Sequence, residues 1–456
     1  MSLIVSVSGI RGTIGGQPSD NLTPNEILKF SLAYGLLLKT KNLKPTIVIG
    51  RDARISGQMV ASFVIASLQS IGINVIDLGL STTPTVEMAV INHQTDGGII
   101  ITASHNPVQW NALKLLNQLG EFISAEDGLK IVEFSKQLNI EFSTAQDLGK
   151  LNILENSMEE HVKAILNLKL IPVDLIRAKK YHIVVDCINS TGALALPILL
   201  DALSCTYELI NGNPNGLFAH NPEPLEIHLQ DLIKACGKNT NLGIAVDPDV
   251  DRLALVDNHG KFFGEEYSLV CVADYVLDHK LGNTVSNLSS TRALADLTNA
   301  KGAHYYACAV GEVHVVKKMK SVHAVIGGEG NGGIILPELH YGRDALVGIA
   351  LILSNMATKN KSLSELKSQY PHYEMFKDKI DLNPNVDYQS LLNYLKDYYK
   401  NEILNLEDGL KIDMANGWLH LRKSNTEPII RIYSEAQSYH TAQLLIEQIK
   451  TLVAKF

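Results

Sequence analysis

Short apolar runs alternate with helix-like segments along most of this chain, and this alternation restricts the possible folds most. Runs at 46–50, 74–78 and 98–101 are separated by helix-like segments, and the pattern resumes at 182–187 and 243–246. Strands that alternate with helices in this way favour a mostly parallel or mixed sheet that is covered on both faces. Ligands bind such sheets at the loops beyond the carboxyl ends of the strands, so functional residues are expected in those loops.

Three alternating blocks are followed by a C-terminal segment of a different kind. The third block has strand-like runs near 284–288, 304–307 and 324–326, whereas Asn416-Gly417 between two apolar runs predicts a hairpin. The length of 456 residues suits three or four domains of roughly 100–200 residues each. We therefore expect an α/β protein with three similar mixed-sheet α/β domains and a smaller α+β C-terminal domain. The expected boundaries are 1–150, 151–257, 258–370 and 371–456.

The composition indicates a globular protein that acts on small molecules. Hydrophobic residues make up 46% and charged residues 19%, which argues against disorder. A net charge of -8 without a basic tract argues against a nucleic-acid partner. No apolar stretch approaches the roughly 20 residues that cross a bilayer, and no signal-peptide pattern is present. With five scattered cysteines and no Cys-x-x-Cys pair, we expect a cytoplasmic protein without a membrane partner. The sequence does not indicate an oligomeric state.

A short polar loop, Thr102-Ala103-Ser104-His105-Asn106-Pro107, directly follows the apolar run 98–101. Asn-Pro stops a helix from continuing, so the Ser104 hydroxyl is expected at the open end of a sheet, where it can react. The residue types of this loop also dominate ordinary turns. Taken by itself, the loop therefore leaves two interpretations, a nucleophile and a plain turn.

A second polar loop follows the apolar run 243–246 and carries Asp247, Asp249 and Asp251 at alternate positions. Three carboxylates so close together repel one another and raise one another's pKa values unless a cation lies among them. All-oxygen ligands suit a hard divalent ion, and Mg²⁺ is the expected one. A calcium loop needs Gly at its sixth position and Glu at its twelfth, where this chain has Arg252 and Asn258. A solvated acidic turn is the remaining alternative.

Two further loops carry arginines that suit phosphate. The segment Arg422-Lys423-Ser424-Asn425-Thr426-Glu427-Pro428, with Arg431 beyond it, combines guanidinium groups with hydroxyls and an amide. The segment Ser8-Gly9-Ile10-Arg11-Gly12 offers backbone amides and one guanidinium. Each is also compatible with an ordinary loop. We assign Arg51-Asp52-Ala53-Arg54 to internal ion pairing.

The segment Gly328-Glu329-Gly330-Asn331-Gly332-Gly333 has four glycines among six residues. Such a backbone can approach a ligand closely while the one carboxylate accepts hydrogen bonds from sugar hydroxyls. A tight turn between strands that needs positive φ is the other interpretation, and the residues alone do not separate the two.

Together these five ordered motifs resemble the α-D-phosphohexomutase superfamily, which includes phosphoglucomutases, phosphomannomutases and phosphoglucosamine mutases. The resemblance spans essentially the whole chain, through motifs at 8–12, 102–107, 247–252, 328–333 and 422–428. It implies four domains around a central cleft and an isomerase that interconverts 6-phospho and 1-phospho hexoses. A phosphoserine enzyme, a hexose 1,6-bisphosphate intermediate that also serves as activator, and sugar-phosphate partners are implied with it.

The resemblance also implies a role for each motif residue. Ser104 matches the serine that carries the phosphoryl group, and Asp247, Asp249 and Asp251 match the ligands of Mg²⁺, which the Ser104 oxygen completes. His105 and Arg11 match residues around the phosphoserine, Arg252 matches the arginine after the metal loop, and Lys114 matches the lysine proposed as general acid or base. Substrate-binding residues are implied at Glu329, Asn331, Arg422, Ser424, Asn425, Thr426 and Arg431.

The sugar-recognition motif departs from the Gly-Glu-x-Ser-Gly-His form of many bacterial members. Asn331 replaces the serine and Gly333 replaces a histidine with a proposed proton-transfer role. The form found here, together with Thr-Glu-Pro in the last motif, is similar to the archaeal-type branch called phosphoglucosamine mutase. Glucosamine 6-phosphate is therefore the expected substrate, and a phosphomannomutase or phosphoglucomutase is the alternative.

Two more remote functions are a Mg²⁺-dependent sugar phosphatase and a non-catalytic sugar-phosphate-binding protein. The phosphatase needs no site for a second phosphate, so the intact loop at 422–428 argues against it. The non-catalytic protein is expected to have lost Ser104 or a metal aspartate, and this chain retains them all.

Overall fold

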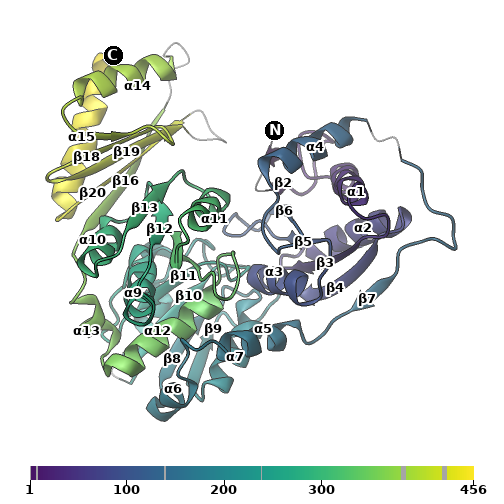
Figure 1. Cartoon of the computed structure of the whole chain (residues 1–456), viewed down its shortest axis with the longest axis horizontal. Helices are drawn as coiled ribbons and strands as arrows, with labels where there is room; N and C mark the ends of the chain where they lie inside the picture. The colour runs from purple at the N-terminus through teal and green to yellow at the C-terminus, as the bar shows by residue number, and fades with distance from the viewer. Residues whose placement is uncertain (1, 7–8, 138–139, 238, 382–386, 424–428) are drawn as a thin grey trace. The chain divides into compact units, whose positions relative to one another are not determined.

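The computed structural model describes residues 2–6, 9–137, 140–237, 239–381, 387–423 and 429–456. The chain forms two compact units (Figure 1). One unit contains Met1–Ser268 and Gly332–Lys367, and the other contains Leu269–Asn331 and Ser368–Phe456. Helix α9 (Glu265–His279) crosses the division between them.

The first sheet has the strand order β1-β2-β6-β5-β3-β4-β7 and is mixed, because β5 pairs in parallel with β3 and antiparallel with β6. Residues 47 and 49 of β3 join a core with α1, α2 and α4, whereas Val48 joins a core with α3 on the opposite face. This alternation is the period of two that a strand covered on both faces requires. The strands are β1 (Ile4–Ser6), β2 (Gly9–Thr13), β3 (Thr46–Arg51), β4 (Asn74–Leu80), β5 (Gly97–Ile101), β6 (Trp110–Leu116) and β7 (Leu151–Ile153). The helices are α1 (Pro24–Lys39), α2 (Gly57–Ser70), α3 (Thr83–Asn92) and α4 (Ala125–Lys136).

The second sheet of this unit has the order β11-β10-β8-β9 and is also mixed. Helix α12 (Ala345–Lys359) packs against α5, α6 and α7. Its residues from Ala345 to Ala357 are buried, so it is a core helix despite its late place in the sequence. The other elements are α5 (Ser157–Leu166), α6 (Val173–Lys179), β8 (His182–Asp186), α7 (Gly192–Ala202), β9 (Thr206–Ile210), η1 (Glu226–His228), α8 (Gln230–Ala235), β10 (Leu242–Val246), β11 (Leu253–Val256), β15 (Gly333–Ile335) and α13 (Leu363–Lys367).

The second unit contains a parallel α/β part and an antiparallel meander. In the α/β part β12 pairs in parallel with β13 and β14. The meander has the order β16-β20-β19-β18-β17, and α14 and α15 pack on one of its faces. The elements are β12 (Thr284–Asn287), α10 (Arg292–Ala300), β13 (Tyr305–Cys308), α11 (Glu312–Ser321), β14 (Ile326–Glu329), β16 (Glu374–Asp381), α14 (Tyr388–Tyr398), β17 (Ile403–Asn405), β18 (Leu410–Met414), β19 (Gly417–Lys423), β20 (Ile429–Ala436) and α15 (Tyr439–Lys455).

These sheets confirm the predicted fold class, and the hairpin predicted at Asn416-Gly417 joins β18 to β19. The residue pattern also predicts a helix at 225–236 and one from about 388 to 404, and both predictions were wrong. The segment 225–236 is split at Leu229, whose backbone leaves the helical region, into η1 and α8. The helix predicted to reach residue 404 ends at Tyr398, because Ile403–Asn405 pairs with β18 as a strand instead. Pairing across the sheet overrides a local helical preference there.

The cysteines are all free and buried, as small apolar side chains are. In the part of the chain that the structure describes, no helix has the length and apolar character that a membrane span needs.

Candidate functional site

The Ser104 loop lies at the carboxyl end of β5, as predicted. Its backbone turns sharply there, and Ser104 has a φ of 49°, a left-handed conformation that few non-glycine residues adopt. The amide of Ser104 donates to Thr102 Oγ1 at 2.9 Å, and the Thr102 hydroxyl donates to Asp52 Oδ2 at 2.7 Å. Strained backbone of this kind persists only where the surrounding contacts hold it, and it occurs most often at functional sites.

Arg54 is the residue that holds this loop. Its guanidinium donates to the carbonyl oxygens of Ser104 and Asn106 at 2.5 and 2.6 Å, and to those of Pro107 and Trp110 at 2.7 and 3.0 Å. Its Nε pairs with Asp52 Oδ2 at 3.0 Å, and both side chains of this pair are fully buried. The predicted internal ion pair therefore exists, and the same guanidinium also shapes the loop that presents Ser104.

The three aspartates of the second polar loop follow β10 and are fully buried. The Ser104 hydroxyl donates to Asp247 Oδ2 at 2.6 Å, so the two predicted loops meet. Asp247 Oδ1 accepts from the backbone amides of Asp251 and Arg252, both at 3.1 Å, which fixes the turn of the loop. One carboxylate oxygen of each aspartate lies within 4.8 Å of those of the other two.

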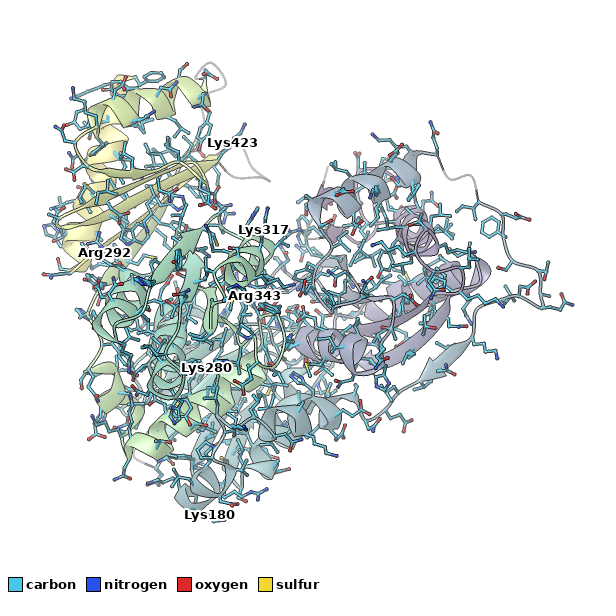
Figure 2. All side chains as sticks on the ribbon, in the orientation of Figure 1. Lys180, Lys280, Arg292, Lys317, Arg343 and Lys423 are labelled. Carbon is cyan, nitrogen blue, oxygen red and sulfur yellow. The ribbon has the colours of Figure 1, made fainter. Side chains whose placement is uncertain are left out.

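Two cations lie against the aspartates. Lys114 Nζ, on β6, contacts Asp249 Oδ2 at 2.7 Å and Asp251 Oδ2 at 3.4 Å. Arg343, marked in Figure 2 on the segment before α12, contacts Asp251 Oδ2 at 2.7 Å. Thr83, the first residue of α3, donates its hydroxyl to Asp249 Oδ2 at 2.7 Å. Neither Arg343 nor Thr83 lies in one of the predicted motifs, and the only local sign of Arg343 is an Arg-Asp pair before an apolar helix.

Burial and neighbouring charges move the pKa values of Asp247 and Asp249 in opposite directions. Burial, together with Asp251 and Asp249, raises the pKa of Asp247 well above its usual range. Burial also acts to raise the pKa of Asp249, but the charge and hydrogen bond of Lys114 outweigh it and lower this pKa. For Lys114, burial acts to lower the pKa, and the charges of Asp249 and Asp251 outweigh it, so the pKa is raised. Lys114 is therefore held as the ammonium ion.

His105 Nδ1 lies 3.4 Å from Ser104 Oγ. Burial, and then the positive charges of Arg252 and Arg343, hold the pKa of His105 well below its usual range, so its imidazole is neutral. Arg252 pairs with Glu223 across 3.5 Å. Arg11 lies on β2 opposite Ala112 of β6, the strand that carries Lys114.

The predicted sugar and phosphate residues that the structure describes lie in the second unit. Glu329 ends β14, is buried, and accepts at Oε1 from Asn287 Nδ2 and from the amide of Gly311, both at 3.0 Å. Asn331 follows it in the same loop. Arg422 and Arg431 are direct partners on β19 and β20, so both guanidinium groups leave the same face of the meander. Ser424, Asn425 and Thr426 lie outside the described residues.

The phosphoglucomutase/phosphomannomutase family matches this chain in four successive parts. Its α/β/α domains I, II and III match residues 3–139, 159–260 and 264–373, and its C-terminal domain matches residues 384–452. A phosphoglucomutase/phosphomannomutase of Thermococcus kodakarensis is 34% identical over 96% of this chain and 96% of its own length. The chain belongs to the α-D-phosphohexomutase superfamily.

Other relatives of this phosphohexomutase agree. A phosphoglucosamine/phosphogalactosamine mutase of Sulfurisphaera tokodaii is 32% identical over 99% of both chains. A crystal structure of a putative phosphomannomutase from Thermus thermophilus has a TM-score of 0.83, with 25% identity and complete coverage of both chains. A phosphoglucomutase/phosphomannomutase family protein of Burkholderia thailandensis has a TM-score of 0.84 at 23% identity, over 98% of this chain and 96% of its own, and supports the fold. The chain is thus a phosphoglucosamine mutase-like isomerase.

The aspartate loop of this phosphohexomutase fits a divalent metal ion. Asp249 Oδ1 and Asp251 Oδ1 are buried oxygens that have no hydrogen-bond partner within the described ranges. Buried oxygens normally have a partner, because a buried carboxylate oxygen without one destabilises the fold by about 1–3 kcal/mol or more. Their hard oxygen chemistry suits Mg²⁺ better than a softer metal.

Proposed function

We propose that this phosphohexomutase interconverts 6-phospho and 1-phospho hexoses through phosphorylated Ser104 and a hexose 1,6-bisphosphate, with glucosamine 6-phosphate as the preferred substrate. The observation that carries the proposal is the contact of Ser104 Oγ with Asp247 Oδ2 at 2.6 Å, beside two aspartates with unpartnered oxygens. A serine in this position is suited to carry a phosphoryl group next to a divalent cation. The domain limits 1–150, 151–257, 258–370 and 371–456 belong to the same proposal.

Asp247, Asp249 and Asp251 are the residues that would hold Mg²⁺, together with an oxygen at Ser104. When bound, Mg²⁺ neutralises charge on the transferring phosphoryl group, which is where most catalysis of phosphoryl transfer arises. The chain itself supplies the position of Ser104, through Arg54 and Thr102, and the cations Lys114 and Arg343 beside the aspartates.

In the first transfer the bond between phosphorus and Ser104 Oγ breaks, and a bond to a sugar hydroxyl forms. Ser104 Oγ then needs a proton, and the sugar hydroxyl loses one. The proton that the sugar hydroxyl loses balances the one that Ser104 Oγ gains, and Lys114, beside Asp249, is proposed as the general acid or base that transfers it. The bisphosphate turns around, and the reverse transfer returns the other phosphoryl group to Ser104.

Arg422, Ser424, Asn425, Thr426 and Arg431 are proposed to hold the phosphate that does not react, and Glu329 and Asn331 to bind sugar hydroxyls. The position of Arg422 opposite Arg431 supports a site with two guanidinium groups. The preference for glucosamine 6-phosphate is supported by the Gly-Asn-Gly-Gly motif and by the names of several relatives, such as the probable phosphoglucosamine mutase of Methanopyrus kandleri, 30% identical. Glucose and mannose phosphates are the alternative substrates, as the name of the Thermococcus kodakarensis relative suggests.

Incubation with sugar phosphates tests the proposal. The Mg²⁺-loaded protein is given glucosamine 6-phosphate, mannose 1-phosphate or glucose 1-phosphate with a trace of the matching bisphosphate, and isomers and free phosphate are followed by ³¹P NMR. We expect the protein to isomerise these sugar phosphates, with the highest kcat/KM for glucosamine 6-phosphate. Release of phosphate without isomerisation would reject a mutase in favour of a phosphatase.

A further inference from the structure

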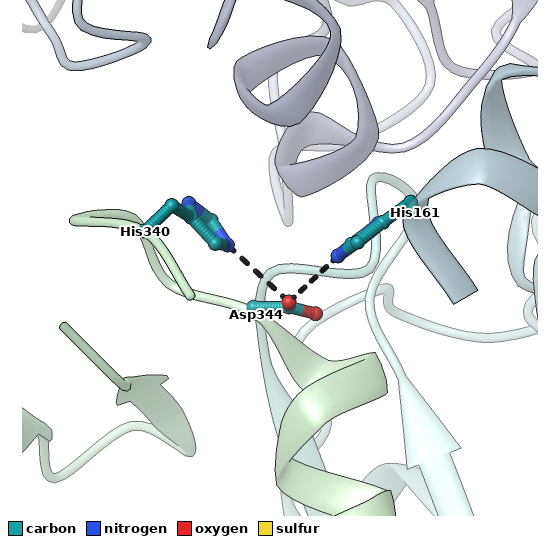
Figure 3. Close-up of side chains that lie close together, drawn as sticks. All are labelled: His161, His340 and Asp344. Atoms are coloured by element: carbon teal, nitrogen blue, oxygen red, sulfur yellow. Dashed lines mark hydrogen bonds and ion pairs between the residues drawn. The ribbon is translucent and has the colours of Figure 1, made fainter. Parts of the chain in front are cut away.

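A buried cluster of charged side chains lies in the unit that holds Ser104, outside the residues assigned above. His161 and His340 both point toward Asp344 (Figure 3). His161 Nε2 and His340 Nε2 lie 3.0 and 3.3 Å from Asp344 Oδ2, and the other ring nitrogen of His340 lies 3.3 Å from Glu87 Oε2. Glu87, His161 and Asp344 are fully buried and His340 is nearly so. Charges buried to this extent are costly and need a reason.

The cluster joins three segments that are distant in the sequence. Glu87 is on α3, His161 is on α5, and His340 and Asp344 precede α12. Asp344 also caps α12, because its Oδ1 accepts from the amides of Leu346 and Val347 at 2.8 and 3.2 Å. One carboxylate thus faces two imidazoles and a helix N-terminus.

Two of these segments also contact the metal aspartates. Thr83 lies one helical turn before Glu87 on α3, and it donates its hydroxyl to Asp249 Oδ2 and its amide to the Asp249 carbonyl. Arg343 precedes Asp344 in the chain and contacts Asp251 Oδ2 at 2.7 Å. An ion pair between Glu87 and the segment of Asp344 therefore ties together two elements that both contact the aspartates.

His340 supplies the ion pair that joins Glu87 to this segment. Its Nε2 hydrogen-bonds Asp344 Oδ2 at 3.3 Å, and its Nδ1 lies 3.3 Å from Glu87 Oε2, at ion-pair distance. As an imidazolium, the ring places positive charge against both carboxylates and so bridges Glu87 and Asp344. Burial acts to lower the pKa of His340, but hydrogen bonds and charge from Asp344 and Glu87 outweigh it and raise this pKa to about 10. His161, from α5, is a further titratable group packed on it, and its ring meets the His340 ring edge to face at 6.0 Å.

A metal ion is the other species that this geometry could accept. The ligand atoms of His161, His340 and Asp344 lie within 4.8 Å of one another, but the group contains no fourth ligand among the residues described. Closed structural zinc sites use four protein ligands, and a proton on each histidine satisfies the contacts without a metal. A bridging imidazolium at His340 is therefore the better account of the cluster.

We propose that His340 is a positioning residue that, as an imidazolium between Glu87 and Asp344, holds Thr83 and Arg343 against Asp249 and Asp251. The expected fall in kcat rests on the proposed function, whereas the expected loss of metal affinity at the aspartates does not. Substitution of a residue that orients metal ligands commonly lowers metal affinity by roughly 10–100-fold.

The test compares His340→Gln with Glu87→Gln, which removes one charge at nearly constant volume. His93→Gln is the matched control, because His93 at the end of α3 pairs with Glu160 of α5 at 3.1 Å on the surface. We expect both cluster variants to bind Mn²⁺ roughly 10-fold more weakly in an electron paramagnetic resonance titration. Their kcat should fall by a similar factor with little change in the KM for sugar phosphate, and His93→Gln should match the wild type.

Two results would overturn the proposal. One is unchanged Mn²⁺ affinity in folded Glu87→Gln and His340→Gln. The other is one equivalent of tightly bound zinc in the wild type, by elemental analysis, that His161→Gln removes. Nitrogen-15 NMR of the histidine rings at pH 8 should show both His340 nitrogens protonated. The Mn²⁺ and NMR measurements need no sugar turnover, so weaker Mn²⁺ binding in a protein without mutase activity would refute the proposed function and leave this inference standing.

Discussion

Replacing Arg54 by lysine tests whether the Ser104 loop depends on a single guanidinium. Arg54 donates to Asp52 and to four loop carbonyls, those of residues 104, 106, 107 and 110. Lysine keeps the charge but offers one nitrogen with three donors, so it cannot span these five acceptors. At least two acceptors then lose their partner.

The structure gives the size of the effect. An unsatisfied buried acceptor costs about 1–3 kcal/mol, so two of them predict a loss of roughly 2–6 kcal/mol. The lower part of this range applies, because Pro107 is exposed and Asn106 and Trp110 are partly exposed, so water can reach some of the carbonyls. We therefore expect a loss of about 2–4 kcal/mol in the stability of the Ser104 loop.

Hydrogen exchange followed by mass spectrometry measures this loss directly in peptides that contain Ser104, and kcat measures its effect on the reaction. At a temperature where the variant stays folded, we expect faster exchange in these peptides and a kcat reduced by about 10² or more, since a misplacement of about 1 Å costs that much. Arg51→Lys is the control, because Arg51 bonds Gln58 at the surface and should change stability by less than about 0.5 kcal/mol. Wild-type exchange and kcat in Arg54→Lys would refute the reasoning.

Other predictions follow from the same geometry. Ser104→Ala should abolish turnover and leave the circular dichroism spectrum unchanged. Mass spectrometry should detect a phosphorylated Ser104 peptide in the wild type and none in the variant, and full activity of the variant would identify another nucleophile. Asp249→Asn should weaken Mn²⁺ binding by 10-fold or more in a titration, on the order of a lost ligand contact. Lys114→Gln should lower kcat by roughly 10²–10⁴ in a steady-state assay, as for a lost proton donor, and a change in KM alone would contradict that role. The pKa of His340 is raised from 6.5 to about 10, so its stabilisation is complete below pH 6.5 and is lost as pH rises toward 10. The difference in Tm between the wild type and His340→Gln should shrink over that pH range.

The local sequence was sufficient to predict which strands carry the Ser104 loop and the aspartate loop at their ends. Ser104 and Asp247 each follow a buried strand, β5 and β10, because an apolar run that ends in polar residues can only place them at the edge of a sheet. The aspartate spacing likewise predicted a metal loop, since three carboxylates at alternate positions need a cation nearby. The fold class followed from the alternation of strands and helices.

The tertiary structure alone decided what surrounds those loops. Arg54 precedes Ser104 by fifty residues, and Arg343 follows Asp251 by ninety-two, so no local pattern connects them. His340 was not selected as a functional residue at all, because its role depends on two carboxylates from α3 and the start of α12 that meet only when the chain is packed. A sequence specifies the groups that can react, whereas the burial that makes their charges interact strongly exists only in the folded protein.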